Sequence, residues 1–485
     1  MEFKDLSLKE IIAKIKSKEV TQKEVYDYFL ARIEKLDPTI EAFSYINKEF
    51  VEQDINSPLA GVPIGVKDMF CEKGVPTKNS TKMLENFVPP YDATVIKKLK
   101  KAGFNSIGKT ANDPFGMGSS GENSDFKKSK NPWDPTRIPG GSSSGSATAV
   151  AAGLVPAALG TDTGGSCRQP GSMCSLVGFR PTYGRSSRQG IIAYSSSLDT
   201  PGTLTKTVED AALLFEIMGG YDPMESTSIK EELKINPAIW DKKDLKGIKV
   251  GVPKEYFMEG LDAGVKNEIQ KGIELMKSLG AEIIDISMPY TEYALSVYYI
   301  IVFAESSTNL SRYDGIRFGY ANDESLKSLD EAYKKNRSEG FGKEAKRRIM
   351  LGSFVLSSGF YDAYYHKAAL VRELIRNDFT EAFKKVDVII SPVSPEVAWK
   401  YGSEKVDDPI KMYLADVFTV PVPLAGVPAI SVPCGFAKPS DGDKELPVGI
   451  QIIGPKLGEE KIFEVGHVFE QANKEYINSK KPEIF

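Results

Sequence analysis

The sequence predicts a layered α/β fold in which helices cover a largely buried sheet, and three observations support this class. Short apolar runs typical of buried strands alternate along the chain with amphipathic stretches typical of helices. The 485 residues are 41% hydrophobic and 26% charged, an ordinary globular composition with enough apolar side chains for a large core. Neither an internal repeat nor a linker divides the chain. We therefore expect one large domain over residues 1–485.

The first part of the chain, residues 1–60, is expected to be a helical arm. Ser7 with Glu10 and Thr21 with Glu24 form two capping-box patterns, and each opens an amphipathic run. We expect this arm to pack on the body of the protein or on a partner.

The α/β pattern begins at residue 62, and residues 62–220 are expected to form the core of the domain. Strands are expected at 62–66, 104–107, 155–159, 248–252, 282–286, 386–390, 429–432 and 449–453. Helices are expected at 93–102, from the Gly/Ser segment at 140–146 to about residue 153, and at 264–279. Between residues 289 and 365 the chain becomes polar and helical. This change predicts a helical insertion that covers one edge of the sheet.

The charge and cysteine content exclude several functional classes. The 62 basic and 66 acidic side chains give a formal net charge of −4, which offers no electrostatic footprint for direct binding to nucleic acid or anionic membranes. The four cysteines form no CxxC pair, which favours a reducing compartment. No signal-peptide stretch and no apolar run of 18 residues occurs, so we expect a cytoplasmic protein.

Histidine is scarce, and this scarcity limits the possible catalytic bases. Only His366 and His467 occur. His366 lies in a tyrosine-rich helical stretch, and His467 lies in a C-terminal amphipathic helical stretch. Neither is a good candidate for a catalytic base, so a Ser-His-Asp triad is disfavoured.

Three segments combine glycine, serine or lysine at places where strands end: Gly65–Asp68, Pro139–Ser146 and Gly160–Pro170. Each has an ordinary alternative. Lys67 in the first segment would extend its ammonium to solvent, and the Gly/Ser run would be a flexible loop. A phosphate cradle is a further alternative, but neither glycine-rich segment fits G-x-x-x-x-G-K-[ST] or G-x-G-x-x-G.

Together the three segments indicate covalent catalysis by a serine. Apolar flanks at 155–159 and 177–179 anchor the third segment to a core, which a flexible linker would lack. Its Thr-Gly-Gly-Ser turn supplies consecutive backbone N–H donors, which an oxyanion requires, with a hydroxyl at its end. A serine nucleophile needs a base within hydrogen-bond distance, and a buried lysine kept neutral by desolvation is the remaining candidate.

These residues carry a resemblance to the amidase-signature family of serine hydrolases. Lys67, the Gly140–Ser143 block and the glycine-rich block that ends at Ser166 match its motifs in order. Lys67 and Ser142 are 75 residues apart, and Ser142 and Ser166 are 24 residues apart. The resemblance covers nearly the whole chain and implies a single α/β/α domain with a central mixed sheet covered by helices.

The resemblance also implies a Ser–cis-Ser–Lys triad without a metal. Ser166 is the implied nucleophile, Ser142 is the middle serine after a cis peptide bond, and Lys67 is the base. The implied oxyanion hole consists of backbone N–H groups of the glycine-rich turn, from Thr163, Gly164, Gly165 and Ser166. Ser143 and Arg168 match positions that support the triad through hydrogen bonds. For Arg168, an ion pair with a structural role is the alternative.

The chain departs from the family pattern at Ser144, Cys167 and Pro114, where glycine, isoleucine and an acidic residue are common. None of these departures removes a catalytic group. Because Ser144 replaces a common glycine, the tight backbone geometry that glycine allows in this loop is not assured. Cys167 is expected to be a small buried hydrophobic residue.

Within the family, the resemblance is greatest to the glutaminase subunits of tRNA-dependent amidotransferases. Two later stretches, Arg347–Gly352 and Ser357–Tyr365, carry this finer resemblance. It implies that Arg348 binds the α-carboxylate of free glutamine and that Asp416 binds its α-ammonium. It also implies that one tyrosine of the Tyr298–Tyr299 pair touches the ligand, with Tyr299 preferred. The alternatives are a surface arginine for Arg348 and a helix-terminal carboxylate for Asp416.

This branch of the family implies a heterotrimer with B and C subunits. The B subunit would use ammonia from glutamine to amidate Glu-tRNA(Gln), Asp-tRNA(Asn) or both, and tRNA would bind mainly through it. ATP and magnesium are expected at the B subunit, and no cofactor is expected in this chain. Two other functions stay open: a stand-alone amidase of the same family that acts on small amides, and a non-catalytic protein that binds phosphate or a nucleotide.

Overall fold

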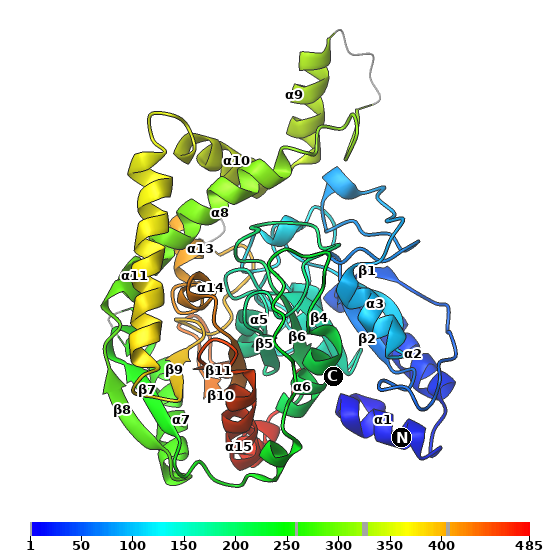
Figure 1. Cartoon of the computed structure of the whole chain (residues 1–485). Coiled ribbons are helices and arrows are strands. Elements are labelled where there is room, and N and C mark those ends of the chain that lie inside the picture. Colours follow the sequence, from blue (N-terminus) through cyan, green and yellow to red (C-terminus); the bar gives the residue numbers. More distant parts are fainter. Residues whose placement is uncertain (1, 258–259, 323–327, 404–407) are drawn as a thin grey trace.

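A mixed β-sheet runs through the centre of the computed structural model (Figure 1), which describes residues 2–257, 260–322, 328–403 and 408–485. Within these residues the sheet has eleven strands in the spatial order β1-β3-β2-β4-β6-β5-β10-β11-β9-β7-β8. They are β1 (Phe43–Ile46), β2 (Pro63–Lys67), β3 (Asn105–Thr110), β4 (Ala157–Thr161), β5 (Val177–Arg180), β6 (Pro201–Thr205), β7 (Lys249–Pro253), β8 (Glu282–Ile286), β9 (Val388–Pro392), β10 (Ala429–Ala437) and β11 (Leu446–Ile453). β2 is parallel to β3 and β4, and β7 is parallel to β8 and β9, whereas the other neighbours are antiparallel. The predicted α/β fold with a central mixed sheet is confirmed.

Helices cover both faces of this sheet. They are α1 (Leu8–Lys16), α2 (Gln22–Ile40), α3 (Thr94–Lys101), α4 (Ser144–Ala151), α5 (Arg168–Met173), α6 (Val208–Met218), α7 (Ala263–Ser278), α8 (Ala294–Leu310), α9 (Leu329–Gly340), α10 (Lys343–Val355), α11 (Lys367–Ala382), α13 (Pro409–Leu414), α14 (Pro421–Ala425) and α15 (Glu459–Asn478). Ser431 of β10 donates to the Arg168 carbonyl of α5 at 2.9 Å, whereas the next residue, Val432, packs at Gly466 of α15. Because successive side chains of a strand point to opposite faces, α5 and α15 lie on opposite sides of the sheet.

The strands predicted from apolar runs are all present, and all but β8 (predicted at 282–286) have shifted boundaries. β2, β4, β7 and β9 begin one or two residues later than predicted, and β10 continues to Ala437. Most of these strands are buried along their whole length, which is why their sequences are apolar runs.

The N-terminal segment is helical only in part. α1 and α2 begin with the two predicted capping boxes, at Ser7 and Thr21. Helical structure ends at Ile40, and Phe43–Ile46 then forms edge strand β1, which pairs antiparallel with β3. The prediction of a helical arm through residue 60 is therefore wrong after Ile40, because a four-residue edge strand leaves too short a pattern to recognise.

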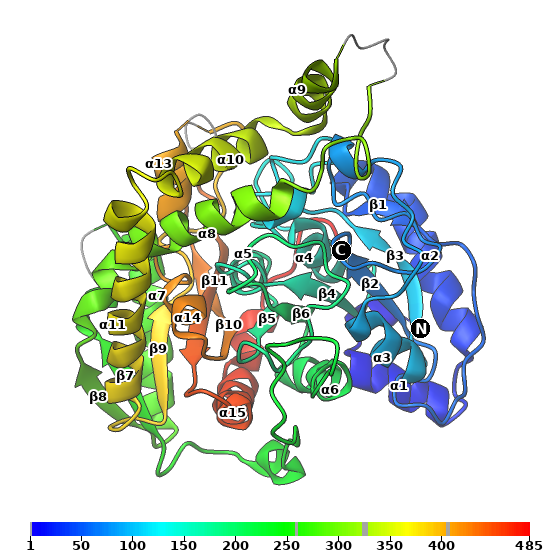
Figure 2. The same cartoon turned by 45° about the horizontal axis from the view of Figure 1, so that its top comes forward.

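Residues 289–365 hold α8, α9 and α10, as their helical pattern predicts, while residues 323–327 of this span lie outside the described residues. Helical structure continues through Asp362–His366 into α11 and ends at Ala382. Ile375 and Phe379 of α11 share an apolar cluster with Ile286 of β8 and Ile389 of β9. The helix that packs at the β8 end of the sheet is thus α11, whereas α9 projects away from the body (Figure 2).

Among the helices of the described residues, none has both the length and the apolar character needed to cross a membrane.

Candidate active site

The predicted base, Lys67, is buried at the C-terminal end of β2. Its Nζ donates to Ser142 Oγ at 2.8 Å, to Thr161 Oγ1 at 2.8 Å and to Ser143 Oγ at 3.0 Å. Burial lowers the pKa of Lys67 to about 8, although the carboxylates of Asp113, Asp162 and Asp199 partly oppose this shift. An amine with such a pKa is available in its neutral form near physiological pH and can accept a proton.

Ser142 accepts from Lys67, and its two neighbours in the chain tie it to the segment that carries Ser166. The peptide bond that precedes it, Gly141–Ser142, is cis, as the resemblance implies. Gly141 N donates to Gln169 Oε1 at 3.0 Å, and Ser143 N donates to the Ser166 carbonyl at 3.2 Å. These two bonds hold the Gly140–Ser143 block against the turn that carries Ser166.

The glycine-rich turn leaves its backbone donors available. In the described part of the chain, the N–H groups of Thr163, Gly164, Gly165 and Ser166 donate to no protein acceptor. Gly165 has φ +136°, and a Cβ there would lie 2.5 Å from Thr419 Oγ1, so this position requires glycine. Thr163 Oγ1 donates to Asp199 Oδ1 at 2.7 Å, which fixes one end of the turn. The arrangement can bind an oxyanion.

One narrow cavity contains Ser166 together with the predicted substrate-binding residues. Its lining in the described residues is Gly116, Gly118, Ser119, Gly164, Ser166, Tyr298, Tyr299, Arg348 and Asp416. These residues come from the glycine-rich turn, α8, α10, the loop after α13 and the segment that follows β3. The fold thus brings together side chains that lie far apart in the sequence.

Arg348 projects from α10 toward this cavity and is only 4% exposed, so the alternative of a surface arginine is wrong. Its Nε donates to Glu344 Oε1 at 2.7 Å, and its terminal nitrogen donates to the Tyr194 hydroxyl. The guanidinium carbon lies 5.5–5.8 Å from the ring centroids of four aromatic side chains, Tyr194, Tyr299, Phe303 and Tyr413. This setting holds a permanent positive charge at the cavity wall.

Asp416 is the matching negative group. Asp416 comes just after the end of α13, as the alternative of a helix-terminal carboxylate expects. Its side chain is nevertheless buried and lines the cavity. It accepts from Ser119 Oγ at 2.8 Å and from the Tyr299 hydroxyl at 2.6 Å. Burial raises its pKa to about 6. Tyr299 therefore both lines the cavity and orients Asp416.

Arg168 forms a buried ion pair, which is the structural role given above as the alternative to support of the triad. It is fully buried and lies 2.8 Å from Asp162, which also contacts Arg180. These two guanidinium groups hold the pKa of Asp162 below its usual range against the opposing effect of burial. Arg168 also donates to the Thr419 carbonyl at 3.0 Å, directly behind the glycine-rich turn.

The histidines and the departures from the family pattern take no part in this cavity as far as the structure describes it. His467 packs against Trp240 with ring centroids 5.2 Å apart, and His366 is exposed. Ser144 begins α4, and burial raises the pKa of the Cys167 thiol to about 12, so Cys167 is a neutral buried group.

Sequence reasoning missed two side chains that complete the site, Thr161 and Ser119, and gave Tyr298 only as the less favoured member of the Tyr298–Tyr299 pair. Thr161 contacts Lys67, Ser119 contacts Asp416, and Tyr298 lines the cavity next to Tyr299. Thr161 lies within the glycine-rich segment Gly160–Pro170, but the roles of Thr161 and Ser119 depend on contacts that local sequence does not reveal.

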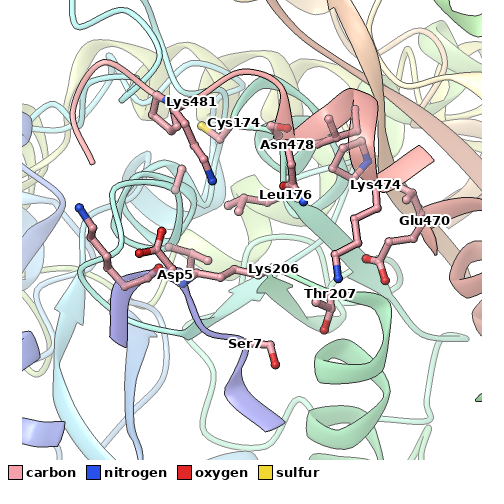
Figure 3. Close-up of a pocket in the computed structure, with 18 of the residues that line it drawn as sticks. Asp5, Ser7, Cys174, Leu176, Lys206, Thr207, Glu470, Lys474, Asn478 and Lys481 are labelled. Carbon is pink, nitrogen blue, oxygen red and sulfur yellow. Dashed lines mark hydrogen bonds between the residues drawn. The ribbon is translucent and has the colours of Figure 1, made fainter. Parts of the chain in front are cut away.

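A second cavity of about 720 Å³ lies between the N-terminal segment and α15 (Figure 3). Lys206 and Glu470 are among the residues that line it. None of the predicted site residues belongs to its lining in the described part of the chain. The candidate active site is therefore the smaller cavity at Ser166.

The site combines a buried lysine at the C-terminal end of an inner strand with two serines and free backbone donors. These are features of a serine-dependent amidase. The chain belongs to the amidase family, because the family model named Amidase matches residues 24–463. Among curated relatives, it is 51% identical to the A subunit of glutamyl-tRNA(Gln) amidotransferase from Thermoanaerobacter pseudethanolicus, with 98% of each chain covered. It is 49% identical to the protein of the same name from Geobacter metallireducens, over 97% of this chain and 98% of the relative. Among solved structures, the A subunit of glutamyl-tRNA(Gln) amidotransferase from Thermotoga maritima aligns with a TM-score of 0.82 and 37% identity, covering 97% of this chain and 95% of that one.

Proposed function

We propose that this chain is the glutaminase subunit of a tRNA-dependent amidotransferase. It hydrolyses glutamine to glutamate and ammonia, and a partner B subunit uses the ammonia to amidate Glu-tRNA(Gln), Asp-tRNA(Asn) or both. The observation that carries this proposal is that Ser166, Arg348 and Asp416 line one cavity. A free amino acid needs a cation for its carboxylate and an anion for its ammonium, next to the nucleophile that attacks its side chain.

Substrate binding follows from the two charged groups. Arg348 binds the α-carboxylate of glutamine, and Asp416 binds its α-ammonium. Tyr299 and Ser119 hold the Asp416 carboxylate in place through hydrogen bonds of 2.6 and 2.8 Å. The side-chain amide then points toward Ser166.

The chemical step moves one proton from Ser166 through Ser142 to Lys67. The Ser166 oxygen attacks the amide carbon, and the N–H groups of the glycine-rich turn stabilise the oxyanion. Lys67 returns the proton through Ser142 to the leaving nitrogen, so that the C–N bond breaks and ammonia departs. Water then hydrolyses the γ-glutamyl ester by the same proton path and restores Ser166.

The partners belong to the proposal as well. Because the relatives are named as A subunits of an amidotransferase, we expect this chain to act in a heterotrimer with B and C subunits. ATP and magnesium act at the B subunit, which also carries most of the tRNA contact. This chain uses no cofactor of its own.

The test is a transamidation assay on the complex purified with its B and C subunits. Ser166→Ala removes the nucleophile, so glutamine-dependent amidation falls by at least ~10³-fold. The same complex supplied with ammonium chloride still amidates misacylated tRNA, because the B subunit needs only ammonia. A Ser166→Ala complex that keeps its glutamine-dependent rate contradicts the mechanism.

The stand-alone amidase is the competing function, and substrate preference distinguishes it. The proposed subunit prefers free glutamine to small aliphatic amides, and its rate rises when B, C and misacylated tRNA are added. A chain that hydrolyses small amides faster than glutamine, with no response to the partners, is a stand-alone amidase.

A further inference from the structure

The guanidinium of Arg348 is held by two other side chains of the protein. Its Nε donates to Glu344 Oε1 at 2.7 Å, and its Nη1 donates to the Tyr194 hydroxyl. Among the described residues, none accepts a hydrogen bond from its Nη2. Because the guanidinium is a planar, rigid fork, the two bonds fix its plane and leave Nη2 as the nitrogen that can bind a carboxylate in the Ser166 cavity.

Glu344 is the charged member of this pair of partners. It lies in the first turn of α10, one turn before Arg348, and its side chain is 11% exposed. Its Oε1 also accepts from the Tyr413 hydroxyl at 3.1 Å, and its Oε2 accepts from Arg347. Burial alone would raise the pKa of Glu344, but the charges of Arg348 and Arg347 hold it below its usual range. Glu344 is therefore an anion at neutral pH, with both carboxylate oxygens in use.

Tyr413 joins Glu344 to the residues that bind the α-ammonium of the substrate. Its ring stacks on Tyr299, with centroids 4.0 Å apart and an interplanar angle of 25°. Its carbonyl accepts from Asp416 N at 3.1 Å, and the Asp416 carboxylate accepts from the Tyr299 hydroxyl. A continuous set of contacts thus connects the two charged groups of the cavity.

The chemistry of the substrate explains why such a connection matters. A free amino acid carries its carboxylate and its ammonium on one carbon atom, so the cation and the anion that bind them must keep one separation. Arg348 lies on α10 and Asp416 follows α13, so no single element fixes this separation. Glu344 and Tyr413 form a direct side-chain contact between these two elements. Neither lines the Ser166 cavity in the part of the chain that the structure describes, so they act on glutamine through the groups they hold.

We propose that Glu344 is a positioning residue for the α-amino acid part of glutamine. It holds Arg348 so that Nη2 meets the α-carboxylate, and through Tyr413 it keeps Arg348 at a fixed distance from Asp416. This inference rests on the proposed function and adds two residues that do not touch the substrate. The alternative is a purely structural role, because a carboxylate in the first turn of a helix also stabilises that helix.

The first test compares Glu344→Gln and Glu344→Ala with the wild type in the complex with the B and C subunits. The Gln side chain keeps an oxygen for Arg348 but loses the charge, whereas Ala loses the contact. We expect the KM for glutamine to rise about threefold for Glu344→Gln and at least about tenfold for Glu344→Ala, with a smaller change in kcat. Glu373→Gln is the matched control, since Glu373 pairs with Arg376 and its side chain is 59% exposed. It keeps the wild-type KM.

A substrate analogue distinguishes positioning from a general loss of structure. 4-Aminobutanamide is glutamine without its α-carboxylate, so it makes no use of Arg348. Its KM as a substrate, or its inhibition constant against glutamine, should stay within about twofold of the wild-type value in Glu344→Ala. A purely structural role would weaken glutamine and the analogue by the same factor.

Tyr413→Phe tests the connection to the second charged group. It removes the hydroxyl that donates to Glu344 and keeps the ring that stacks on Tyr299. We expect the KM for glutamine to rise about threefold in the wild-type background and not to rise further in Glu344→Ala. A residue that acts through Glu344 has nothing to hold once that carboxylate is gone.

Three results overturn the inference. Both Glu344 variants keep the wild-type KM for glutamine, or Glu344→Ala weakens glutamine and 4-aminobutanamide equally, or the KM increases of Tyr413→Phe and Glu344→Ala multiply in the double variant. In each case the wild-type complex still hydrolyses glutamine, so the proposed function stands. A wild-type complex that does not hydrolyse glutamine overturns the proposed function, and this inference with it.

Discussion

Lys67 illustrates how burial alone can prepare a catalytic base. Its hydrogen-bond partners are three hydroxyl groups. The carboxylates of Asp113, Asp162 and Asp199 attract its positive charge electrostatically without a direct hydrogen bond to it. Because no ion pair stabilises the ammonium in the described residues, desolvation dominates and lowers the pKa to about 8. Hydroxyls can pass a proton on, whereas a carboxylate partner would keep the lysine charged.

The first prediction concerns the pH dependence of this base. Below pH 8 most of Lys67 is protonated, and the neutral fraction that can accept a proton shrinks about tenfold per pH unit. The kcat/KM for glutamine therefore falls about tenfold per pH unit on the acid side and levels off above pH 8. Lys67→Arg retains its proton at every accessible pH and is inactive throughout. The measurement is steady-state ammonia release between about pH 6 and pH 9, a range that brackets the pKa. A flat profile for the wild type would argue against Lys67 as the base.

Asp416 is a second residue whose burial has a functional consequence. Its pKa is raised to about 6, so the carboxylate is charged above pH 6 and becomes neutral as the pH falls through that value. The attraction for the α-ammonium of glutamine is therefore present above pH 6 and is lost below it. We expect the KM for glutamine to rise on acidification.

Asp416→Asn tests this expectation, because asparagine still accepts the hydrogen bonds from Ser119 and Tyr299 but has no charge. The KM for glutamine should rise about 10- to 100-fold at neutral pH, with a smaller change in kcat. The variant should also lose the acid-side rise in KM that the wild type has. If the KM of the variant matches that of the wild type, Asp416 is not the ammonium-binding group.

At the scale of elements, the crossing of α8 and α10 sets the position of Arg348. A Cβ on Gly352 would lie 2.0 Å from the Phe303 carbonyl oxygen, so the two helices touch backbone to backbone at this point. Arg348 is one turn away on the same face of α10. The separation of these helices thus fixes how far the guanidinium reaches into the cavity.

Gly352→Ala should push α10 away from α8 and withdraw Arg348. Overpacking of this kind costs about 1–3 kcal/mol, and we expect a lower thermal midpoint together with an increase of about tenfold in the KM for glutamine. Gly359→Ala is the control, because a Cβ there meets no atom within 4 Å. Equal KM values for the two variants would show that the crossing does not position Arg348.

The elements also show what a single sequence can and cannot reveal. Buried strands such as β2 and β9 are continuous apolar runs, and their sequences predicted them. β1 and β6 escaped prediction because their sequences, Phe-Ser-Tyr-Ile and Pro-Gly-Thr-Leu-Thr, have neither an apolar run nor a clear alternation. β5 was also not predicted as a strand, because its four residues were recognised only as an apolar flank at 177–179.

The same limit applies to the site. The positions of Lys67, Ser142 and Ser166 were accessible because fixed motifs at fixed spacings mark them. The contact between Ser119 and Asp416 joins residues 297 positions apart, and no local pattern marks either as a partner of the other. Burial is equally invisible: the sequence left a surface arginine open for Arg348, and only packing excludes it.

For the whole molecule, a buried polar network joins the two halves of the sheet beneath the active site. Asp162 follows β4 and pairs with Arg168 of α5, whose guanidinium donates to Gln451 of β11. Gln451 in turn donates to Ser391 of β9 at 2.6 Å. Since Arg168 also holds the Thr419 carbonyl behind Gly165, the network fixes the glycine-rich turn relative to the distant strands.

Arg168→Met should therefore lower both stability and activity. The change leaves the Thr419 carbonyl and the Gln451 side chain without their buried donor, and it removes one of the two positive charges beside Asp162. We expect the free energy of unfolding to fall by about 3 kcal/mol. This is the lower end of the range for a broken buried ion pair, because Arg180 still pairs with Asp162. Loss of support behind the turn should also reduce kcat about tenfold or more. A smaller rise in the KM for glutamine should accompany it, because Thr419 also binds the Asp416 carbonyl through its N–H and its hydroxyl. Urea unfolding and steady-state kinetics measure the two effects. Arg376→Met is the control: its ion pair with Glu373 is about half exposed and contributes less than about 1 kcal/mol. If both variants unfold at the same urea concentration, the network does not hold the halves of the sheet together.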